Sequence, residues 1–215
     1  MQKITMKQNK TPGILITFCG LDGCGKTTMI NRLKNELESE TVFITKQPTD
    51  FVRNLEIFRN YQDSPEHTGY DYRSLSLIAA SDRLQHTNHV ILPELRKGKI
   101  VISDRYIFSC IANLRARGYK KDKWVYEITS RILKPDIAFF FDLPVKTAVL
   151  RVKSRPEERD NYIDIKLQRR LRCEYKAICR SCNGVLIPTD ISEDESFRLV
   201  KEHVKEAINN AKRRG

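Results

Sequence analysis

The sequence has 215 residues, and its 39 Lys and Arg outnumber its 27 Asp and Glu, which gives a formal net charge of +12 at pH 7. This length suits one compact domain with its own hydrophobic core, and the basic balance favours anionic ligands such as nucleotides or nucleic acids. No apolar run is long enough to cross a membrane, and residues 1–12 form a polar N-terminal extension, so we expect a cytoplasmic protein that does not enter membranes.

Five short apolar runs alternate along the chain with longer helical or polar segments. The first run, residues 14–19, precedes a glycine-rich turn and a helical pattern that places Ile30, Leu33 and Leu37 on one face. The later runs are residues 41–44, 100–102, 137–141 and 185–187. Such runs are typical of strands that are buried on both faces of a parallel sheet. We therefore predict an α/β fold in which about five parallel strands are flanked by helices.

The last part of the chain predicts a helix that packs on this sheet. Ser192 and Glu195 form a capping-box pattern, and four apolar residues then recur at helical spacing: Phe197, Val200, Val204 and Ile208. We find no internal repeat, low-complexity linker or shift in composition, so we expect residues 1–215 to form a single domain.

The glycine-rich turn has the pattern of a phosphate-binding P-loop. Residues 20–27 satisfy G-x-x-x-x-G-K-[ST] between a buried strand and a helix. In such a loop the backbone N–H groups and the helix N-terminus face the phosphates, Lys26 contacts the β- and γ-phosphates, and the Thr27 hydroxyl coordinates Mg²⁺. We predict a P-loop NTPase fold that binds ATP with Mg²⁺ through Gly20, Asp22, Gly23, Cys24, Gly25, Lys26, Thr27 and Thr28.

Asp104 and Arg105 follow the apolar run at residues 100–102, so we expect them at a strand's carboxyl end beside the P-loop. The Asp104 carboxylate could hold the metal through water or accept a proton from the acceptor, and the Arg105 guanidinium could bind an acceptor phosphate. The alternative is a surface salt bridge. The position directly after a buried strand favours a functional role.

Three arginines, Arg151, Arg155 and Arg159, are spaced four residues apart around a charged segment, and on a helix they would share a face. We expect a mobile lid at about residues 153–162, whose guanidinium groups could stabilise charge on the transferring phosphoryl group while closure excludes water. The alternative is an ordinary solvated basic face.

The six cysteines are expected to be free thiols in a reducing compartment. Cys179 and Cys182 form a C-x-x-C pair with Cys173 upstream, but a structural zinc site needs four ligands and no second pair has suitable spacing. Packing is the favoured role and zinc the lesser alternative.

Several separated motifs together resemble those of the thymidylate kinase family, from about residue 13 to the final helix. Residues 20–28 are similar to the family's P-loop, in which an acidic residue, here Asp22, reaches the acceptor sugar. Residues 104–106 match D-R-Y, and Ser109 follows at the expected distance. Residues 82–86 resemble D-R-x-Q-H, whose arginine reaches toward the acceptor base. Residues 134–136 and 142–144 are similar to the family's P-D strand and the segment after it.

The resemblance implies an ATP-dependent kinase for dTMP that forms a homodimer. Because no basic residue stands at Gly23 or Cys24, it also implies that the lid supplies the catalytic arginine, with Arg151 contacting ATP. The implied catalytic residues are Lys26, Asp104, Arg105, Arg155 and Arg159. The implied acceptor-binding residues are Asp22, Lys46, Pro48, Arg83, Arg105, Ser109 and Asn113, and the implied metal ligands are Thr27 and Asp104.

The chain departs from the family pattern where the acceptor is recognised. Ala79 stands where an aromatic usually stacks on thymine, Asn113 and Leu114 replace a tyrosine and a glutamine, and Gln47 replaces a glutamate. These changes leave open a different nucleotide or nucleotide-like acceptor.

We predict a nucleoside monophosphate kinase that converts dTMP to dTDP. The alternatives are a related P-loop kinase with another acceptor, and a nucleotide switch or nucleic-acid-binding ATPase, which the positive charge suggests. The chain lacks an N-K-x-D guanine motif and a recognisable nucleic-acid module, so we expect no specific nucleic-acid partner.

Overall fold

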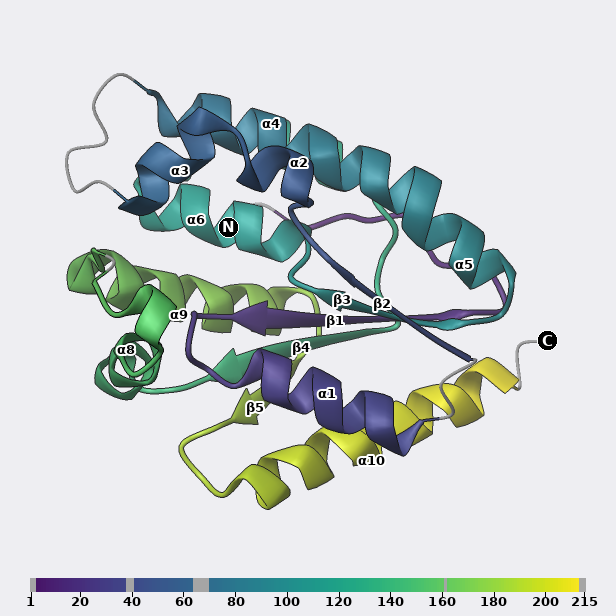
Figure 1. The fold of residues 1–215 in the computed structure, drawn as a ribbon. Coiled ribbons are helices and arrows are strands. Elements are labelled where there is room, and N and C mark those ends of the chain that lie inside the picture. Colours follow the sequence, from purple (N-terminus) through teal and green to yellow (C-terminus); the bar gives the residue numbers. More distant parts are fainter. Residues whose placement is uncertain (1–2, 38–40, 64–69, 161, 213–215) are drawn as a thin grey trace.

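The computed structural model describes residues 3–37, 41–63, 70–160 and 162–212. Within them five parallel strands form one sheet in the order β2-β3-β1-β4-β5 (Figure 1). The strands are β1 (Ile14–Gly20), β2 (Val42–Lys46), β3 (Ile100–Asp104), β4 (Ile137–Asp142) and β5 (Val185–Pro188). Each lies on one of the predicted apolar runs, so the predicted α/β fold with a parallel sheet is confirmed.

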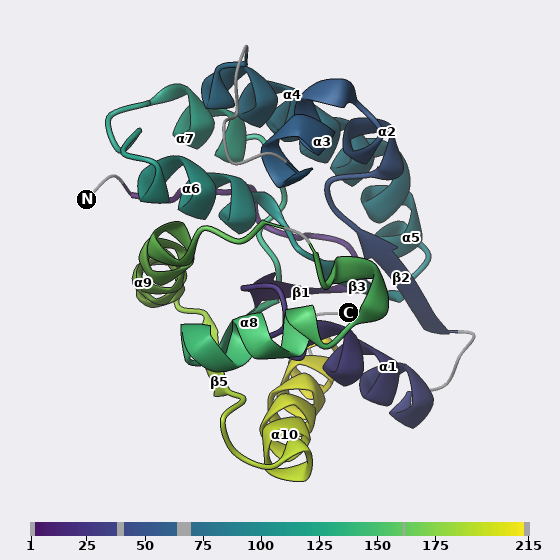
Figure 2. The same cartoon turned by 60° about the vertical axis from the view of Figure 1, so that its left-hand side comes forward.

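Helices cover both faces of the sheet, and α8 and α9 lie next to each other near its carboxyl end (Figure 2). α1 and α10 pack together on one face, while α6 and α9 pack together on the other (Figure 1). The long helices are α1 (Lys26–Glu36), α3 (Glu56–Asp63), α4 (Tyr72–His86), α6 (Ile107–Ala116), α8 (Val145–Lys153), α9 (Ile165–Ser181) and α10 (Glu193–Lys212). The shorter ones are α2 (Asp50–Arg53), η2 (Thr87–Ile91), α5 (Leu92–Arg96), α7 (Trp124–Thr129) and η3 (Pro156–Glu158).

The core is built on the central strands, where β1 is buried along its whole length. The Phe18 ring packs against the rings of Phe139 and Phe141, with ring centroids 5.3 and 5.4 Å apart. Burial on both faces was also expected of the outer strands, and there the prediction is wrong. Ile44 of β2 is 37% exposed and Leu186 of β5 is 43% exposed, because an edge strand has a neighbour on one side only and the helices cover it less completely.

The predicted cap of the last helix is present. The Ser192 hydroxyl accepts a hydrogen bond from the Glu195 N–H at 3.2 Å, and the Glu195 carboxylate accepts one from the Ser192 hydroxyl at 2.6 Å. Phe197, Val200 and Val204 are buried on the face of α10 that packs against the sheet and α1. Within the described ranges, no helix is both long and apolar enough to cross a membrane.

The polar segment that precedes β1 is tied to the start of β4. The Lys7 N–H donates to the Ile132 carbonyl at 2.9 Å. Asp136 accepts from the Asn9 side-chain amide at 2.8 Å and from the Leu15 N–H at 2.9 Å. One carboxylate therefore joins the N-terminal segment, β1 and β4, which gives the P-D motif a structural role.

We expect Asp136→Ala to lower the free energy of unfolding by about 1–3 kcal/mol, because the buried Leu15 N–H would lose its acceptor. Urea unfolding at neutral pH measures this change. Asp160→Ala, at an exposed position, is the control and should shift stability by less than about 0.5 kcal/mol. Equal midpoints for Asp136→Ala and the wild type would contradict the structural role.

Candidate active site

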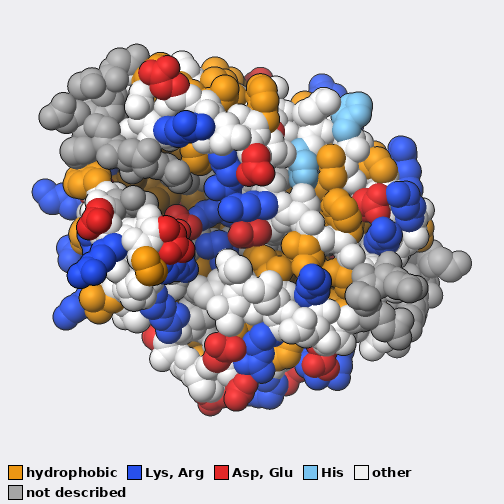
Figure 3. Space-filling view, in the orientation of Figure 1, with side chains coloured by type: hydrophobic (Ala, Val, Ile, Leu, Met, Phe, Trp, Pro, Cys, Tyr) orange, Lys and Arg blue, Asp and Glu red, His pale blue; other side chains and the backbone are white. Residues whose placement is uncertain are grey.

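A pocket of about 600 Å³ opens at the carboxyl ends of β1 and β3. The P-loop, α4, α6, α8 and α9 all contribute to its lining. Lys and Arg side chains gather around this hollow in the space-filling view (Figure 3). This is the edge of the sheet at which a parallel α/β fold binds its ligands.

The P-loop joins β1 to α1, as predicted. Gly20, Gly23 and Gly25 have φ angles of 147°, 77° and 89°, which side chains rarely adopt. A Cβ atom at Gly23 would also lie 2.3 Å from the Ala148 carbonyl oxygen, so α8 packs too closely for any other residue. α1 begins at Lys26 without a side-chain cap, so its N-terminal N–H groups can face an anion.

Lys26 is buried, and its ammonium donates to the carbonyl oxygens of Leu21 at 2.8 Å and Gly20 at 3.4 Å. The Thr27 and Thr28 side chains are exposed and line the pocket. The P-loop thus places one ammonium group and two hydroxyl groups where a triphosphate can reach them.

Arg105 is bonded to the P-loop rather than to its neighbour Asp104. Its backbone has a φ of 65°, and its N–H donates to the Phe18 carbonyl at 2.8 Å. Its guanidinium donates to Gly20 O at 3.2 Å and forms an ion pair with Asp22. Desolvation would raise the pKa of Asp22, but the charges of Arg105 and Lys26 outweigh it and hold that pKa well below its ordinary value.

Asp104 ends β3, and its carboxylate lines the pocket. Its Oδ1 atom is buried and has no hydrogen-bond partner in the described part of the chain. A buried carboxylate oxygen without a donor is costly unless a ligand satisfies it. The geometry therefore leaves this oxygen available to a metal ion, a metal-bound water or an acceptor group.

The pocket wall beyond Arg105 carries further positive charge. Lys46 ends β2 at the pocket, and Arg83 is buried on α4, where it donates to the Ala79 carbonyl at 2.8 Å. Arg53 on α2 also lines the pocket, and its Nε donates to the Pro48 carbonyl at 2.8 Å. Sequence reasoning missed Arg53, because a single arginine in a short polar stretch carries no motif.

Asn113 is held in place by two hydrogen bonds. Its side-chain oxygen accepts from Arg117 at 2.6 Å, and its side-chain nitrogen donates to the Ser109 carbonyl at 2.9 Å. The Arg117 guanidinium lies 3.8 Å from the centroid of the Tyr72 ring. Arg117 and Tyr72 both line the pocket and were not predicted, since their contact joins α4 to the end of α6.

Gln47, one of the departures from the family pattern, does not line the pocket. Its side chain is fully buried and lies 3.1 Å from His86 Nδ1, while Thr45 Oγ1 lies 2.8 Å from His86 Nε2. Asp82 accepts from both the Thr49 N–H at 2.9 Å and the Thr49 hydroxyl at 2.5 Å. The residues 82–86 thus hold the segment between β2 and α2.

The expectation that Arg151, Arg155 and Arg159 share a helical face is wrong. α8 ends at Lys153, and the backbone at Arg155 is extended, because Pro156 disfavours a helical conformation in the residue before it. Arg155 lines the pocket 3.0 Å from Glu158. Arg151 donates to the Thr189 carbonyl at 3.2 Å, and Arg159 is exposed.

The structure brings most of the predicted site residues together. Those that line the pocket are Gly20, Asp22, Gly23, Gly25, Lys26, Thr27, Thr28, Lys46, Pro48, Arg83, Asp104, Arg105, Ser109, Asn113 and Arg155. Those outside its lining are Cys24, which is fully buried, Arg151 and Arg159.

The cysteines of the C-x-x-C pair lie at the end of α9, and the Cys182 thiol donates to the Cys179 carbonyl at 3.7 Å. Burial raises the pKa of Cys182 to about 11, which disfavours the thiolate that a metal would need. Cys173 is exposed farther up the same helix. In the part of the chain that the structure describes, no three potential ligands cluster around a common point.

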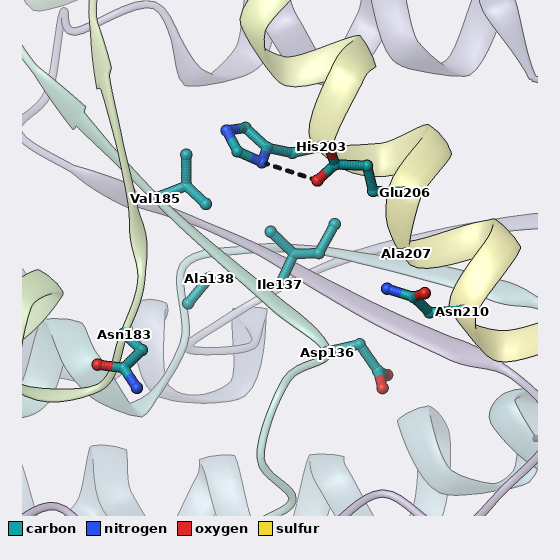
Figure 4. A pocket seen from close by; sticks show the side chains of 9 residues that line it. All are labelled: Asp136, Ile137, Ala138, Asn183, Val185, His203, Glu206, Ala207 and Asn210. Carbon is teal, nitrogen blue, oxygen red and sulfur yellow. Dashed lines mark ion pairs between the residues drawn. The ribbon is translucent and has the colours of Figure 1, made fainter.

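A second, smaller hollow of about 190 Å³ lies at the amino ends of β4 and β5 (Figure 4). Asp136 and Asn183 lie on one side of it. His203 and Glu206 lie on α10, with His203 Nδ1 3.6 Å from Glu206 Oε2. It is at the opposite edge of the sheet from the P-loop and contains none of the predicted catalytic or nucleotide-binding residues.

Comparisons with known proteins agree on one family. Residues 18–200 match the family model described as "Thymidylate kinase". A protein of Pyrococcus abyssi described as "Probable thymidylate kinase" is 36% identical over 195 residues, which cover 85% of this chain and 93% of that protein. A "Thymidylate kinase" of Prochlorococcus marinus is 29% identical over 92% of this chain and 99% of that protein.

A solved structure is also similar. The crystal structure of thymidylate kinase from Ehrlichia chaffeensis superposes with a TM-score of 0.67 at 25% sequence identity. The match covers 90% of this chain and 98% of that one. The predicted P-loop NTPase fold is therefore confirmed.

Burial lowers the pKa of His86 below its ordinary value, although Asp82 opposes the shift. The folded chain then binds fewer protons at this site than the unfolded chain, so the stabilisation is complete above a pH of about 6.5 and declines as the pH falls. Between pH 7 and pH 5, we expect the free energy of unfolding to fall more for the wild type than for His86→Gln, measured by urea unfolding. The exposed His89→Gln serves as control and should follow the wild type; an equal decline in His86→Gln would contradict the assignment.

Proposed function

The chain belongs to the thymidylate kinase family, and from this premise we propose that it transfers the γ-phosphoryl group of ATP to dTMP, giving dTDP and ADP. It is a phosphotransferase whose acceptor is a phosphate group. The observation that carries the proposal is a single pocket in which a P-loop faces Asp104, Arg105 and a second set of basic side chains. Such a pocket can bind a triphosphate donor and a monophosphate acceptor at the same time.

On the donor side, we assign the triphosphate of ATP to the P-loop N–H groups and to Lys26. The helix N-terminus and the ammonium group both favour negative charge, and they do so at fixed positions. Arg151 lies beside Thr189, which follows β5 on the donor side of the loop, and this supports its assignment to ATP. These groups position the γ-phosphate without forming a bond to it.

On the acceptor side, we assign the dTMP phosphate to Arg53, Arg105 and Lys46. All three line the pocket between the P-loop and α4. Charge-assisted contacts from guanidinium groups fix both the position and the orientation of a phosphate. Arg105 is itself held by Asp22, so the acceptor phosphate would be oriented relative to the P-loop.

Beyond the phosphate, Arg83, Ser109 and Asn113 are assigned to the nucleoside. The Arg83 Nε is buried with no hydrogen-bond partner among the described residues, which leaves it for a polar atom of the base. Pro48 lines the same wall.

Thr27 and Asp104 fit a magnesium ion. A hydroxyl and a carboxylate oxygen are the hard ligands that Mg²⁺ prefers, and the buried Asp104 Oδ1 has no other partner in the described chain. When bound, the ion would neutralise phosphate charge during transfer. We also assign to Asp104 the acceptance of a proton from an acceptor that binds beside Arg105.

We assign Arg155 and Arg159 to stabilisation of the transferring group. Arg155 already lines the pocket, and Arg159 follows the short η3 turn on an exposed segment. Movement toward the P-loop of residues 153–162, of which residue 161 lies outside the described ranges, would bring both groups onto the phosphates and exclude water.

A homodimer is proposed from the same family membership. Phe51 on α2 is 71% exposed and Leu77 on α4 is 46% exposed, while α2 packs against α4. Apolar side chains at this exposure are suited to contact with a second copy.

Among nucleoside monophosphates incubated with ATP and Mg²⁺, dTMP should be phosphorylated with the highest kcat/KM. Coupled ADP release measures the rate, and mass spectrometry identifies the product. A reaction without enzyme and one with bovine albumin are the controls. A different preferred acceptor would correct the substrate, and turnover of no monophosphate would refute the proposed function.

Arg159→Ala should lower kcat by at least about tenfold while changing the Kd of ATP by less than about threefold, because the guanidinium stabilises charge in the transition state. Steady-state kinetics and calorimetric titration measure the two quantities. Arg169→Ala, on the exposed face of α9, is the matched control and should keep wild-type kinetics. A loss confined to ATP affinity would show that Arg159 acts only in the ground state.

A further inference from the structure

The acceptor end of the pocket is lined by aromatic and apolar side chains. Phe58, Tyr61 and Tyr72 line it together with Leu75 and Ala79. These residues belong to a small cluster formed by α2, α3 and α4, separate from the main core. A planar ring system is the ligand that such a wall favours, because every nucleobase has a π face that stacks on aromatic side chains.

All three rings pack against the cluster, but two of them also have close ring or cation contacts. The Arg117 guanidinium lies 3.8 Å from the centroid of Tyr72. Tyr61 meets Tyr72 edge to face, with centroids 5.1 Å apart and an interplanar angle of 81°. Phe58 is half-buried, and no ring–ring contact is found for it among the described residues; Arg53 lies 5.8 Å from its centroid. Because the guanidinium beside it lies 5.8 Å from its centroid, whereas Arg117 lies 3.8 Å from that of Tyr72, Phe58 has the more open ring face for a ligand.

Phe58 also lies beside the group that we assign to the acceptor phosphate. Arg53 approaches the Phe58 ring and, at its Nε, the Pro48 carbonyl, so it connects the charged and apolar parts of the wall. α4 contributes four residues to the same cluster, and Ala79, with a single methyl group, is the smallest of them; the others are Tyr72, Leu75 and Ile78. The aromatic surface of the cluster therefore comes from Phe58 and Tyr61 on α3 and from Tyr72 on α4, and the small side chain of Ala79 takes little space beside them.

Resting on the proposed function, we propose that Phe58 determines acceptor specificity by stacking on the base of the acceptor nucleotide. Stacking stabilises the binding of acceptors that have a planar base. It does not stabilise the binding of a sugar phosphate that lacks the base. The free energy gained by stacking of the base on Phe58 is therefore independent of the free energy gained when the arginines bind the phosphate. Loss of the Phe58 ring should weaken the binding of nucleotides, but not that of a sugar phosphate, and should leave the phosphate contacts unchanged.

The test compares wild type and Phe58→Leu with two ligands, dTMP and 2-deoxyribose 5-phosphate, which lacks the base. Calorimetric titration gives the Kd of dTMP, and displacement of dTMP gives that of the sugar phosphate. We expect Phe58→Leu to raise the Kd of dTMP about tenfold, as loss of one stacked base does, and to change that of the sugar phosphate by less than about twofold. Leu186→Ala truncates an exposed apolar side chain on β5 outside the pocket and should change neither.

An unchanged Kd of dTMP in Phe58→Leu would overturn the proposal. So would an equal weakening of both ligands, because Phe58 would then only hold the pocket wall in place. Failure of the wild type to bind dTMP would overturn it as well. Turnover of dTMP by the wild type is measured separately. If dTMP binds but is not phosphorylated, the proposed reaction is refuted. The stacking proposal is then still decided by the two Kd values.

Discussion

The parallel register of β1 and β3 is the constraint on which the rest of the site depends. It pairs Phe18 with Asp104, so β3 ends two residues before β1 does and Arg105 follows directly beside the last residues of β1. The Arg105 N–H then reaches the Phe18 carbonyl, and its guanidinium reaches Gly20 O at 3.2 Å. Because both strands are buried between helices, their register is fixed by side-chain packing. The P-loop and the Asp104–Arg105 pair are therefore neighbours as a consequence of the core.

Positive charge is the second property that shapes the pocket. Its lining contains Lys26, Lys46, Arg53, Arg83, Arg105, Arg117 and Arg155 against Asp22, Asp104, Glu158 and Asp164. Cations gathered in one cavity repel each other, so the phosphates of the two proposed substrates would stabilise the arrangement. The Asp22 carboxylate pairs with Arg105, and despite desolvation the positive charges of Arg105 and Lys26 lower the pKa of Asp22.

The two halves of the pocket depend on different packing. The P-loop is anchored in the main core through Leu21 and Cys24, whereas the aromatic wall formed by Phe58, Tyr61 and Tyr72 belongs to the small cluster of α2, α3 and α4. A departure from the family pattern in that cluster, such as Ala79 in place of an aromatic residue, can alter binding of the base without disturbing the phosphate contacts. Gln47 is another departure from the family pattern, but its side chain does not line the pocket. It contacts His86 and supports the pocket from within the protein.

The sequence by itself determined the five strands, the P-loop and the cap of α10, because each depends on short-range periodicity or on a fixed spacing. It also predicted that Asp104 and Arg105 stand at a strand end. Only the tertiary structure decided that Arg105 pairs with Asp22 and that Arg53 and Phe58 reach the pocket. The physical reason is that the acceptor wall is assembled from helices that are separated in the chain, and its contacts leave no local pattern in the sequence.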